Sequence, residues 1–289
     1  MELFTRFSNK IINNRIIDCH VHLFDANGKT PLNHNINRVG FMDICFCDLD
    51  MYTGNKSEIL YNNYITEELS SSTILLSTAP DPDQVIHIYE NNKEYIKGFG
   101  ELKCYDYSFA NNKPVKLEFK DLKWVYDICN YVKNNQLQMP IYIHYSLDKN
   151  NWEQLKKLFV NFPTISFILC HCGIGTDDEY GFSLCGSPYE SFCFASNLSK
   201  LDNVYLEISY TAANWIYSKN PVAPVSLNSP LCAIHPSKIL LGTDCNNQQF
   251  VSDPNNGSKL YQEQKKIFLD LYKYYGNYNY INIRKLFKL

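Results

Sequence analysis

The 289-residue sequence lacks any long hydrophobic run and any long run of one charge. No stretch approaches the roughly 18 consecutive apolar residues of a membrane helix, so we expect no membrane segment. The formal net charge is −3, which provides no basic surface for nucleic acid or for an anionic membrane. The first 15 residues mix charged and apolar side chains, unlike a secretory leader. These absences favour a cytoplasmic protein.

A glycine-rich phosphate-binding fingerprint is also absent after the first predicted strand, which argues against a doubly wound, dinucleotide-binding sheet. Cysteine, by contrast, is plentiful: the 11 cysteines are odd in number, so they cannot all pair internally. We expect free thiols in a reducing compartment. Strand alternation predicts that Cys19, Cys170 and Cys172 point away from the neighbouring histidines, towards covering helices, as small buried hydrophobes.

Eight segments have the pattern of β-strands, and helices separate most of them. Residues 105–121 and 174–188 are interpreted as loop insertions, and residues 260–275 and 282–287 as two separate terminal helices. This alternation predicts an α/β fold, a single (β/α)₈ TIM barrel that forms one domain over residues 1–289. The predicted strands are residues 16–22, 41–47, 73–78, 96–103, 140–144, 165–171, 204–209 and 239–243.

Two histidines end the first predicted strand. Apolar residues alternate with polar ones through residues 16–22, so His20 and His22 project from one face of the strand. Two imidazoles at this spacing can bind one divalent cation. The pair alone is a weak motif, so its meaning depends on the rest of the chain.

Other polar residues stand where the remaining strands end. In a barrel of this kind the active site lies at the carboxyl ends of the strands. His144 ends the fifth predicted strand, His171 ends the sixth, and Asp244 follows the eighth. Four histidines and an aspartate would therefore converge at one mouth of the sheet.

At this point the sequence resembles the amidohydrolase superfamily, in particular its amidohydrolase-related branch of metal-dependent hydrolases and decarboxylases. The similar segments run from residue 16 to 287 and so cover almost the whole chain. They are Asp18-Cys19-His20-Val21-His22, the single His144, Cys170-His171-Cys172-Gly173, Leu241-Gly242-Thr243-Asp244 and Asn282-Ile283-Arg284-Lys285-Leu286-Phe287.

The resemblance implies that His20, His22, His144 and Asp244 are metal ligands. It also implies that His171 is either a ligand of a second metal or a hydrogen-bond donor to the substrate. Water activated by the metal would be the nucleophile, and Asp244 beside it can act as the general base. Asp18 would lie one layer deeper, behind the ligands.

The fourth predicted strand is ambiguous. Glu101 and Lys103 are two residues apart and share a face, and in this superfamily either a glutamate or a carboxylated lysine on this strand bridges two metals. Glu101 could bridge, Lys103 could bind a substrate carboxylate, or the two could form a buried ion pair. Glu207 and Ser209 on the seventh strand are further candidates for substrate contacts.

Three hypotheses about function are consistent with these residues. The first is a metal-dependent hydrolase of a C–O or C–N bond in a small molecule, with His171 and Asp244 as catalytic residues. The second is a non-oxidative decarboxylase of an aromatic or unsaturated acid, and the third is a catalytically silent barrel that only binds. We expect one or two divalent ions, with Zn²⁺ favoured although imidazole and carboxylate also suit Mn or Fe. The oligomeric state stays open, a homodimer included.

Overall fold

The main sheet is parallel, as the α/β prediction requires. The computed structural model describes residues 17–22, 43–47, 73–77, 82–94, 96–110, 113–119, 122–177, 182–183, 187–219, 230–246 and 254–288. Within these ranges the sheet has nine strands, and all their pairings are parallel. Across the sheet the strands are β12 (Ile239–Leu241), β11 (Val204–Ile208), β8 (Phe167–Leu169), β7 (Ile141–His144), β4 (Ile96–Lys103), β3 (Thr73–Ser77), β2 (Asp43–Cys47), β1 (Ile17–His22) and β13 (Cys245–Asn246).

The two strands at the ends of this order, β12 and β13, are neighbours in the chain. Only residues 242–244 separate them. The backbone N–H of Gly242 donates to the carbonyl of Ile208 at 3.1 Å, and that of Asp244 donates to the carbonyl of His20 at 2.8 Å. Beyond them β13 pairs with β1, with Val21 opposite Cys245. These three residues therefore connect the β11 side of the sheet to the β1 side.

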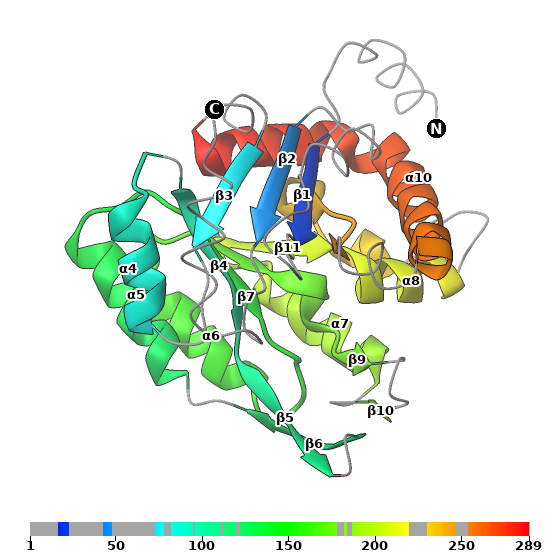
Figure 1. The fold of residues 1–289 in the computed structure, drawn as a ribbon, viewed down its shortest axis with the longest axis horizontal. Helices are drawn as coiled ribbons and strands as arrows, with labels where there is room; N and C mark the ends of the chain where they lie inside the picture. The colour runs from blue at the N-terminus through cyan, green and yellow to red at the C-terminus, as the bar shows by residue number, and fades with distance from the viewer. Residues whose placement is uncertain are drawn as a thin grey trace.

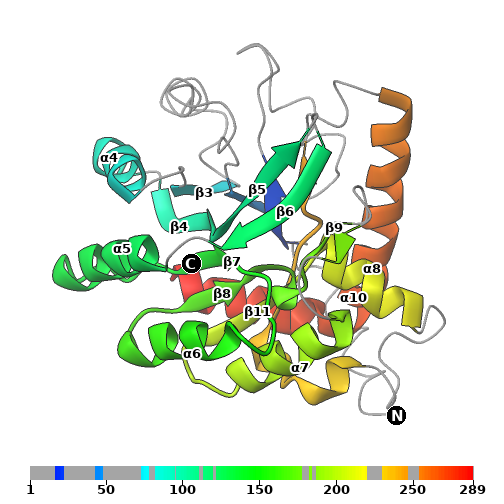
Figure 2. The same cartoon turned by 90° about the horizontal axis from the view of Figure 1, so that it is seen from below.

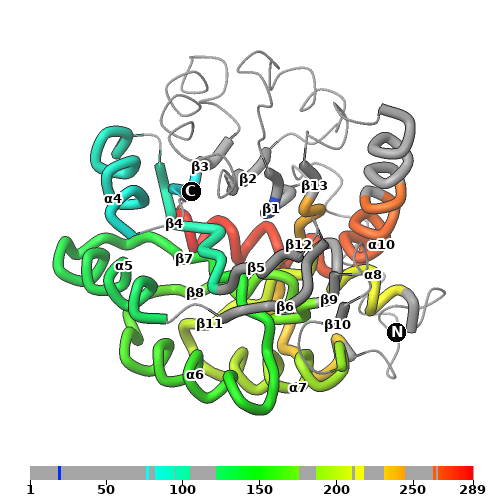
Figure 3. The backbone as a smooth tube through the Cα atoms, turned by 60° about the horizontal axis from the view of Figure 1, so that its bottom comes forward, coloured from blue at the N-terminus to red at the C-terminus, as the bar shows by residue number. Residues whose placement is uncertain are grey.

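Helices line the outer side of the strands (Figure 3). No helix in the part of the chain that the structure describes is both long enough and apolar enough to cross a membrane. The sequence also favours a helix at residues 58–69, which lie outside the described residues. The α-helices are α4 (Pro82–Asn91), α5 (Lys123–Asn134), α6 (Trp152–Asn161), α7 (Pro188–Leu198), α8 (Tyr210–Lys219) and α10 (Pro254–Phe287), and the 3₁₀ turns are η1 (Cys170–Gly173), η2 (Pro230–Ala233) and η3 (Pro236–Lys238).

The strands divide their side chains between two hydrophobic cores. On β7, Ile141 and Ile143 join the larger core beneath the helices, whereas Tyr142 joins a smaller core. Period-two alternation therefore places the smaller core on the inner face of the strands, followed by His144 at the strand end. Residues of the inner core on other strands are Leu76, Ile168, Tyr205 and Leu240.

Helix α10 is one continuous helix of 34 residues, so the prediction of two separate terminal helices was wrong. Its final part crosses the amino ends of the strands (Figure 1) and places Ile283 and Leu286 in the inner core. The Asn279 side-chain oxygen accepts from the N–H of Leu241 at 3.0 Å, and the Asn282 amide donates to the carbonyl of Ile239 at 2.8 Å. The helix thus satisfies backbone groups of β12 that do not pair with another strand.

Residues 105–121, interpreted as a loop, instead contain an antiparallel hairpin. Strand β5 (Tyr105–Ala110) pairs with β6 (Lys113–Phe119), with Tyr105 opposite Phe119. The hairpin extends from the side towards which the strand arrows point (Figures 1 and 2). A second short hairpin, β9 (Thr176–Asp177) with β10 (Phe182–Ser183), replaces part of the other predicted loop.

Candidate metal centre

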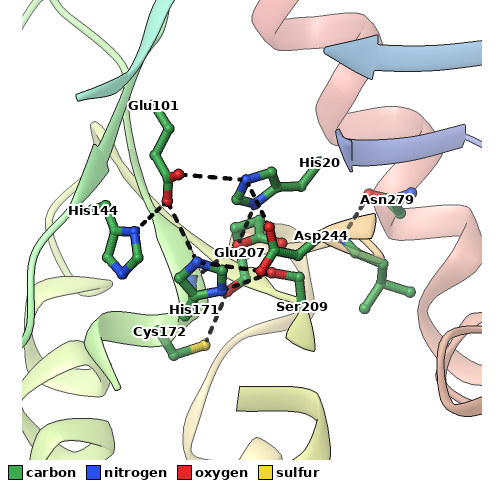
Figure 4. Close-up of polar contacts among 10 residues, drawn as sticks. His20, Glu101, His144, His171, Cys172, Glu207, Ser209, Asp244 and Asn279 are labelled. Atoms are coloured by element: carbon green, nitrogen blue, oxygen red, sulfur yellow. Dashed lines mark hydrogen bonds and ion pairs between the residues drawn. The ribbon is translucent and has the colours of Figure 1, made fainter. Parts of the chain in front are cut away.

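Polar side chains from six strands gather at one end of the sheet (Figure 4). His144 and Asp244 keep side-chain exposures of 17% and 14%, whereas the side chains of Glu101, His171 and the other members of the cluster are 0–5% exposed. The two partly exposed side chains therefore mark the open side of the centre. Its members are His20 from β1, Glu101 from β4, His144 from β7, His171 from η1 after β8, Glu207 and Ser209 from β11 and the residue after it, and Asp244 between β12 and β13.

Glu101 contacts all three imidazoles. Its Oε1 lies 2.6 Å from Nδ1 of His144 and 3.4 Å from Nε2 of His171. Its Oε2 lies 3.8 Å from Nε2 of His20. Of the two candidates on the fourth strand, Glu101 is thus the residue at the centre of the cluster.

Asp244 faces two of the same imidazoles from the opposite side. Its Oδ1 lies 3.5 Å from Nε2 of His20, and its Oδ2 lies 3.8 Å from Nε2 of His171. The backbone of Asp244 is left-handed, with φ of 56°, and its N–H is bound to the carbonyl of His20. The break between β12 and β13 therefore directs this carboxylate towards the histidines.

His171 reaches the centre through a turn, and strand alternation does not place it there. Strand β8 ends before it, and His171, Cys172 and Gly173 all have left-handed backbones, with φ of 52°, 51° and 66°. Gly173 suits this conformation because it has no Cβ, and a Cβ there would lie 2.6 Å from the Leu147 side chain.

This turn also corrects one prediction about the cysteines. Cys170 does not point to the covering helices: it belongs to the inner core with Ile168, two residues before it on the same face. Cys172 joins the larger core as expected. Cys19, like Cys170, instead joins the inner core that α10 closes, so the prediction for Cys19 was also wrong. All three are fully buried, which agrees with their prediction as small buried hydrophobes.

Glu207 and Ser209 support two of the histidines. The Glu207 Oε2 atom lies 3.2 Å from Nδ1 of His20 and accepts the backbone N–H of His171 at 2.9 Å. The Ser209 hydroxyl lies 2.9 Å from Nδ1 of His171. Gly242 makes room for these contacts, because a Cβ there would lie 2.5 Å from the Cβ of His20 and 2.7 Å from Oε1 of Glu207.

The electrostatics of the centre favour a bound cation. Burial alone would lower the pKa of His20, but Glu207, Asp244 and Glu101 outweigh it and raise the pKa to about 10. Burial would raise the pKa of Glu101, yet the imidazoles, His144 first, hold it well below its usual value. Three carboxylates thus lie among three imidazoles. When no cation is bound, this cluster binds a proton instead.

His144 behaves differently from His20. Burial lowers the pKa of His144 to about 4 against the opposing effect of Glu101, and the charge of Lys103 lowers it further. The imidazole is therefore neutral at pH 7, with its Nδ1 atom facing the Glu101 carboxylate at 2.6 Å. Lys103 is itself buried and lies opposite His144 in the register of β4 and β7.

The remaining predicted ligand, His22, is described only in its backbone. It ends β1 and lies opposite Asn246 of β13. The side chains of His22 and Asp18 lie outside the described residues.

Two groups of side chains in the described residues have the composition and spacing of a metal site. One is His20, His171 and Glu207, and the other is Glu101, His144 and His171. Within each group the candidate ligand atoms lie within 4.8 Å of one another. The groups share His171, so the centre has donor atoms for one cation or for two adjacent ones.

Comparison with known proteins gives structural similarity alone. No protein-family model matches the sequence, and no curated protein matches it. The structure is similar to amidohydrolase 2 from Bifidobacterium longum subsp. infantis, with a TM-score of 0.53 over 95% of this chain and 98% of that chain. The fold of this chain is thus similar to that of this amidohydrolase. The sequences are 14% identical.

Two further structures agree with this fold. An amidohydrolase from Burkholderia multivorans, solved with bound zinc, has a TM-score of 0.55 at 11% identity and covers 96% of this chain and 100% of its own. The β-aspartyl dipeptidase from Fervidobacterium islandicum AW-1 has a TM-score of 0.51 at 11% identity, over 95% of this chain and 74% of its own. The resemblance seen in the sequence is therefore confirmed at the level of the fold.

Proposed function

We propose that this chain is a metal-dependent hydrolase that cleaves a C–O or C–N bond of a small molecule. The observation that supports this most is the convergence of His20, Glu101, His144, His171 and Asp244 from separate strands at one end of a parallel sheet. Such a buried charge cluster destabilises a fold unless something compensates it, so its presence favours a functional site.

The side chains fit a divalent cation. Imidazole and carboxylate are ligands of zinc, and in the group of Glu101, His144 and His171 the candidate ligand atoms lie within 4.8 Å of one another. We propose His20, His22, His144 and Asp244 as ligands of one ion, with Glu101 and His171 available to a second. The zinc bound to the Burkholderia multivorans amidohydrolase supports zinc as the first choice.

If these residues held a divalent ion, it would supply water with a pKa lowered to about 7 and would polarise a carbonyl oxygen of the substrate. Asp244 is partly exposed, so its carboxylate can accept a proton from the attacking water and return it to the leaving group. His171 lies within 3.8 Å of Asp244, where its Nε2 can bind a second ion or donate to the substrate. Lys103, buried on β4 beside His144, can bind a substrate carboxylate as a point charge.

Lys103 also supports a second candidate, a non-oxidative decarboxylase of a small aromatic or unsaturated acid. A cation and a lysine ammonium together would hold a carboxylate substrate in the centre. Water would then be displaced, and Asp244 would have no hydrolytic proton to transfer.

We further propose that the sheet closes as the (β/α)₈ barrel predicted from the sequence. The strands at the two ends of its order are joined by residues 242–244, and Asp244 is hydrogen-bonded to His20. Closure would bring the first and last strands together beneath the metal centre.

The proposed function is tested by metal analysis of the purified protein, followed by two substrate panels. We expect about one or two equivalents of zinc, and loss of that zinc in the double variant Glu101→Gln/His144→Gln but not in Glu153→Gln, a control on the exposed face of α6. Zinc-dependent turnover of lactones, esters or amides supports the hydrolase, whereas CO₂ release from carboxylic acids supports the decarboxylase. If the protein holds less than a tenth of an equivalent of metal after incubation with zinc, both enzymatic functions are excluded. The remaining candidate is then a catalytically silent barrel that only binds.

A further inference from the structure

Strand β11 and the residue that follows it contribute two polar side chains, each of which contacts Nδ1 of a histidine. Glu207 Oε2 lies 3.2 Å from Nδ1 of His20, and the Ser209 hydroxyl lies 2.9 Å from Nδ1 of His171. Glu207 and Ser209 are two residues apart, so both project from the inner face of the sheet. We call these two residues the β11 pair.

The other nitrogen of each ring points the opposite way. Nε2 of His20 lies 3.5 Å from Asp244 and 3.8 Å from Glu101. Nε2 of His171 lies 3.8 Å from Asp244 and 3.4 Å from Glu101. Two histidines from different elements thus share one orientation, with Nδ1 towards β11 and Nε2 towards the same two carboxylates (Figure 4).

The contacts of the β11 pair constrain where the ring protons lie. A carboxylate only accepts hydrogen bonds, so the Nδ1 atom that faces Glu207 carries the proton of a neutral His20. The Ser209 hydroxyl lies 2.9 Å from Nδ1 of His171 and can accept a hydrogen bond from it. If Nε2 of His171 binds the cation, the neutral ring carries its proton on Nδ1, and that N–H can donate to Ser209.

Glu207 also holds the backbone of the turn that carries His171. The N–H of His171 donates to Glu207 Oε2 at 2.9 Å, where His171 adopts its left-handed φ of 52°. One carboxylate oxygen therefore fixes the ring of one histidine and the main chain of the other. Both members of the β11 pair are 0% exposed, which argues against the substrate contacts predicted for them from the sequence.

We propose that Glu207 and Ser209 are positioning residues that select the Nδ1–H tautomer of His20 and His171 and so present both Nε2 atoms to the cation. This inference rests on the proposed function, because it assumes that the centre binds a divalent ion. Partners of this kind, which orient metal-binding histidines, typically change metal affinity by about 10–100-fold when mutated.

Zinc affinity and histidine tautomers test the proposal without any assay of turnover. Zinc affinity is measured by competition with a chelator, and tautomers are read from long-range ¹⁵N–¹H spectra of the zinc-loaded protein, which has only seven histidines. In Glu207→Gln the amide can donate to Nδ1 of His20 and reverse its tautomer, so we expect zinc affinity about 10–100-fold weaker. Ser209→Ala should change the His171 signals alone, with a smaller loss of affinity, and Glu153→Gln should match the wild type.

The outcomes separate this inference from the proposed function. A wild-type protein that binds no zinc would overturn both. If the wild type binds zinc, and Glu207→Gln binds it within about twofold with unchanged tautomers, the positioning role is wrong and the metal site stands. If Glu207→Gln does not fold, Ser209→Ala decides: unchanged His171 signals and unchanged zinc affinity would overturn the proposal.

Discussion

Backbone contacts hold Asp244 beside His20 more than side-chain contacts do. Its N–H binds the carbonyl of His20, and its left-handed φ sets the direction of the carboxylate. His20, His144 and Asp244 could be found in the sequence because each stands at or just beyond the end of a predicted strand. The contacts of Glu207 with the histidines could not be predicted from the sequence. A carboxylate on the inner face gives the same sequence pattern whether it contacts a substrate or a histidine.

The first prediction concerns Asp244 as general base. Asp244→Asn keeps the size of the side chain and removes its ability to accept a proton, so we expect turnover to fall by at least about 100-fold. The circular dichroism spectrum should be unchanged, because the backbone hydrogen bond to His20 does not depend on the carboxylate. Asp127→Asn, on the exposed face of α5, is the matched control. Full activity in Asp244→Asn would exclude the role.

Single elements show which patterns a sequence reveals and which it conceals. The strands were predicted nearly to their ends, because buried parallel strands are almost continuously apolar. The β5–β6 hairpin was missed although a signal existed: residues 105–110 and 113–119 alternate between apolar and polar around Asn111 and Asn112. The turn after β8 had no comparable signal, because left-handed backbones at His171 and Cys172 depend on tertiary contacts.

Helix α10 supplies the second prediction. Asn279 is fully buried, and its side chain accepts the N–H of Leu241 at 3.0 Å. Asn279→Ala leaves that buried N–H without this partner, so we expect the free energy of unfolding in urea to fall by about 1–3 kcal/mol. Asn277→Ala, a half-buried position on the same helix, should change it by less than about 0.5 kcal/mol. Equal effects of the two substitutions would mean that the contact with β12 contributes nothing.

The charge balance of the centre acts on the stability of the whole molecule. The carboxylates around His20 raise its pKa to about 10, against the ordinary value of 6.5 for histidine. A group whose pKa is raised on folding stabilises the protein fully at pH values below its unfolded pKa, and this contribution is lost as the pH rises towards the folded pKa. Without metal, protonated His20 therefore stabilises the fold at pH 6.5 and progressively less towards pH 10.

The third prediction follows from this loss of stability with rising pH. Between pH 6.5 and 9 the metal-free protein should lose thermal stability, whereas zinc needs the deprotonated ring, so its stabilising effect should grow. We expect the increase in Tm on adding zinc to be larger at pH 9 than at pH 6.5 by about 5 °C. Calorimetry with chelator or with zinc measures the difference, and His20→Gln should abolish most of its pH dependence. An increase in Tm that is the same at both pH values would contradict the assigned charge balance.

The short connection between β12 and β13 has a consequence for synthesis of the protein. Asp244 and the helix that closes the inner core both follow the other ligands in the chain, some of them by more than 200 residues. A nascent polypeptide that stops before this connection lacks one carboxylate of the centre and the asparagines that cap β12. If the centre binds a cation as proposed, a fragment that ends before this connection would lack Asp244, and we expect it to bind the cation more weakly than the full chain.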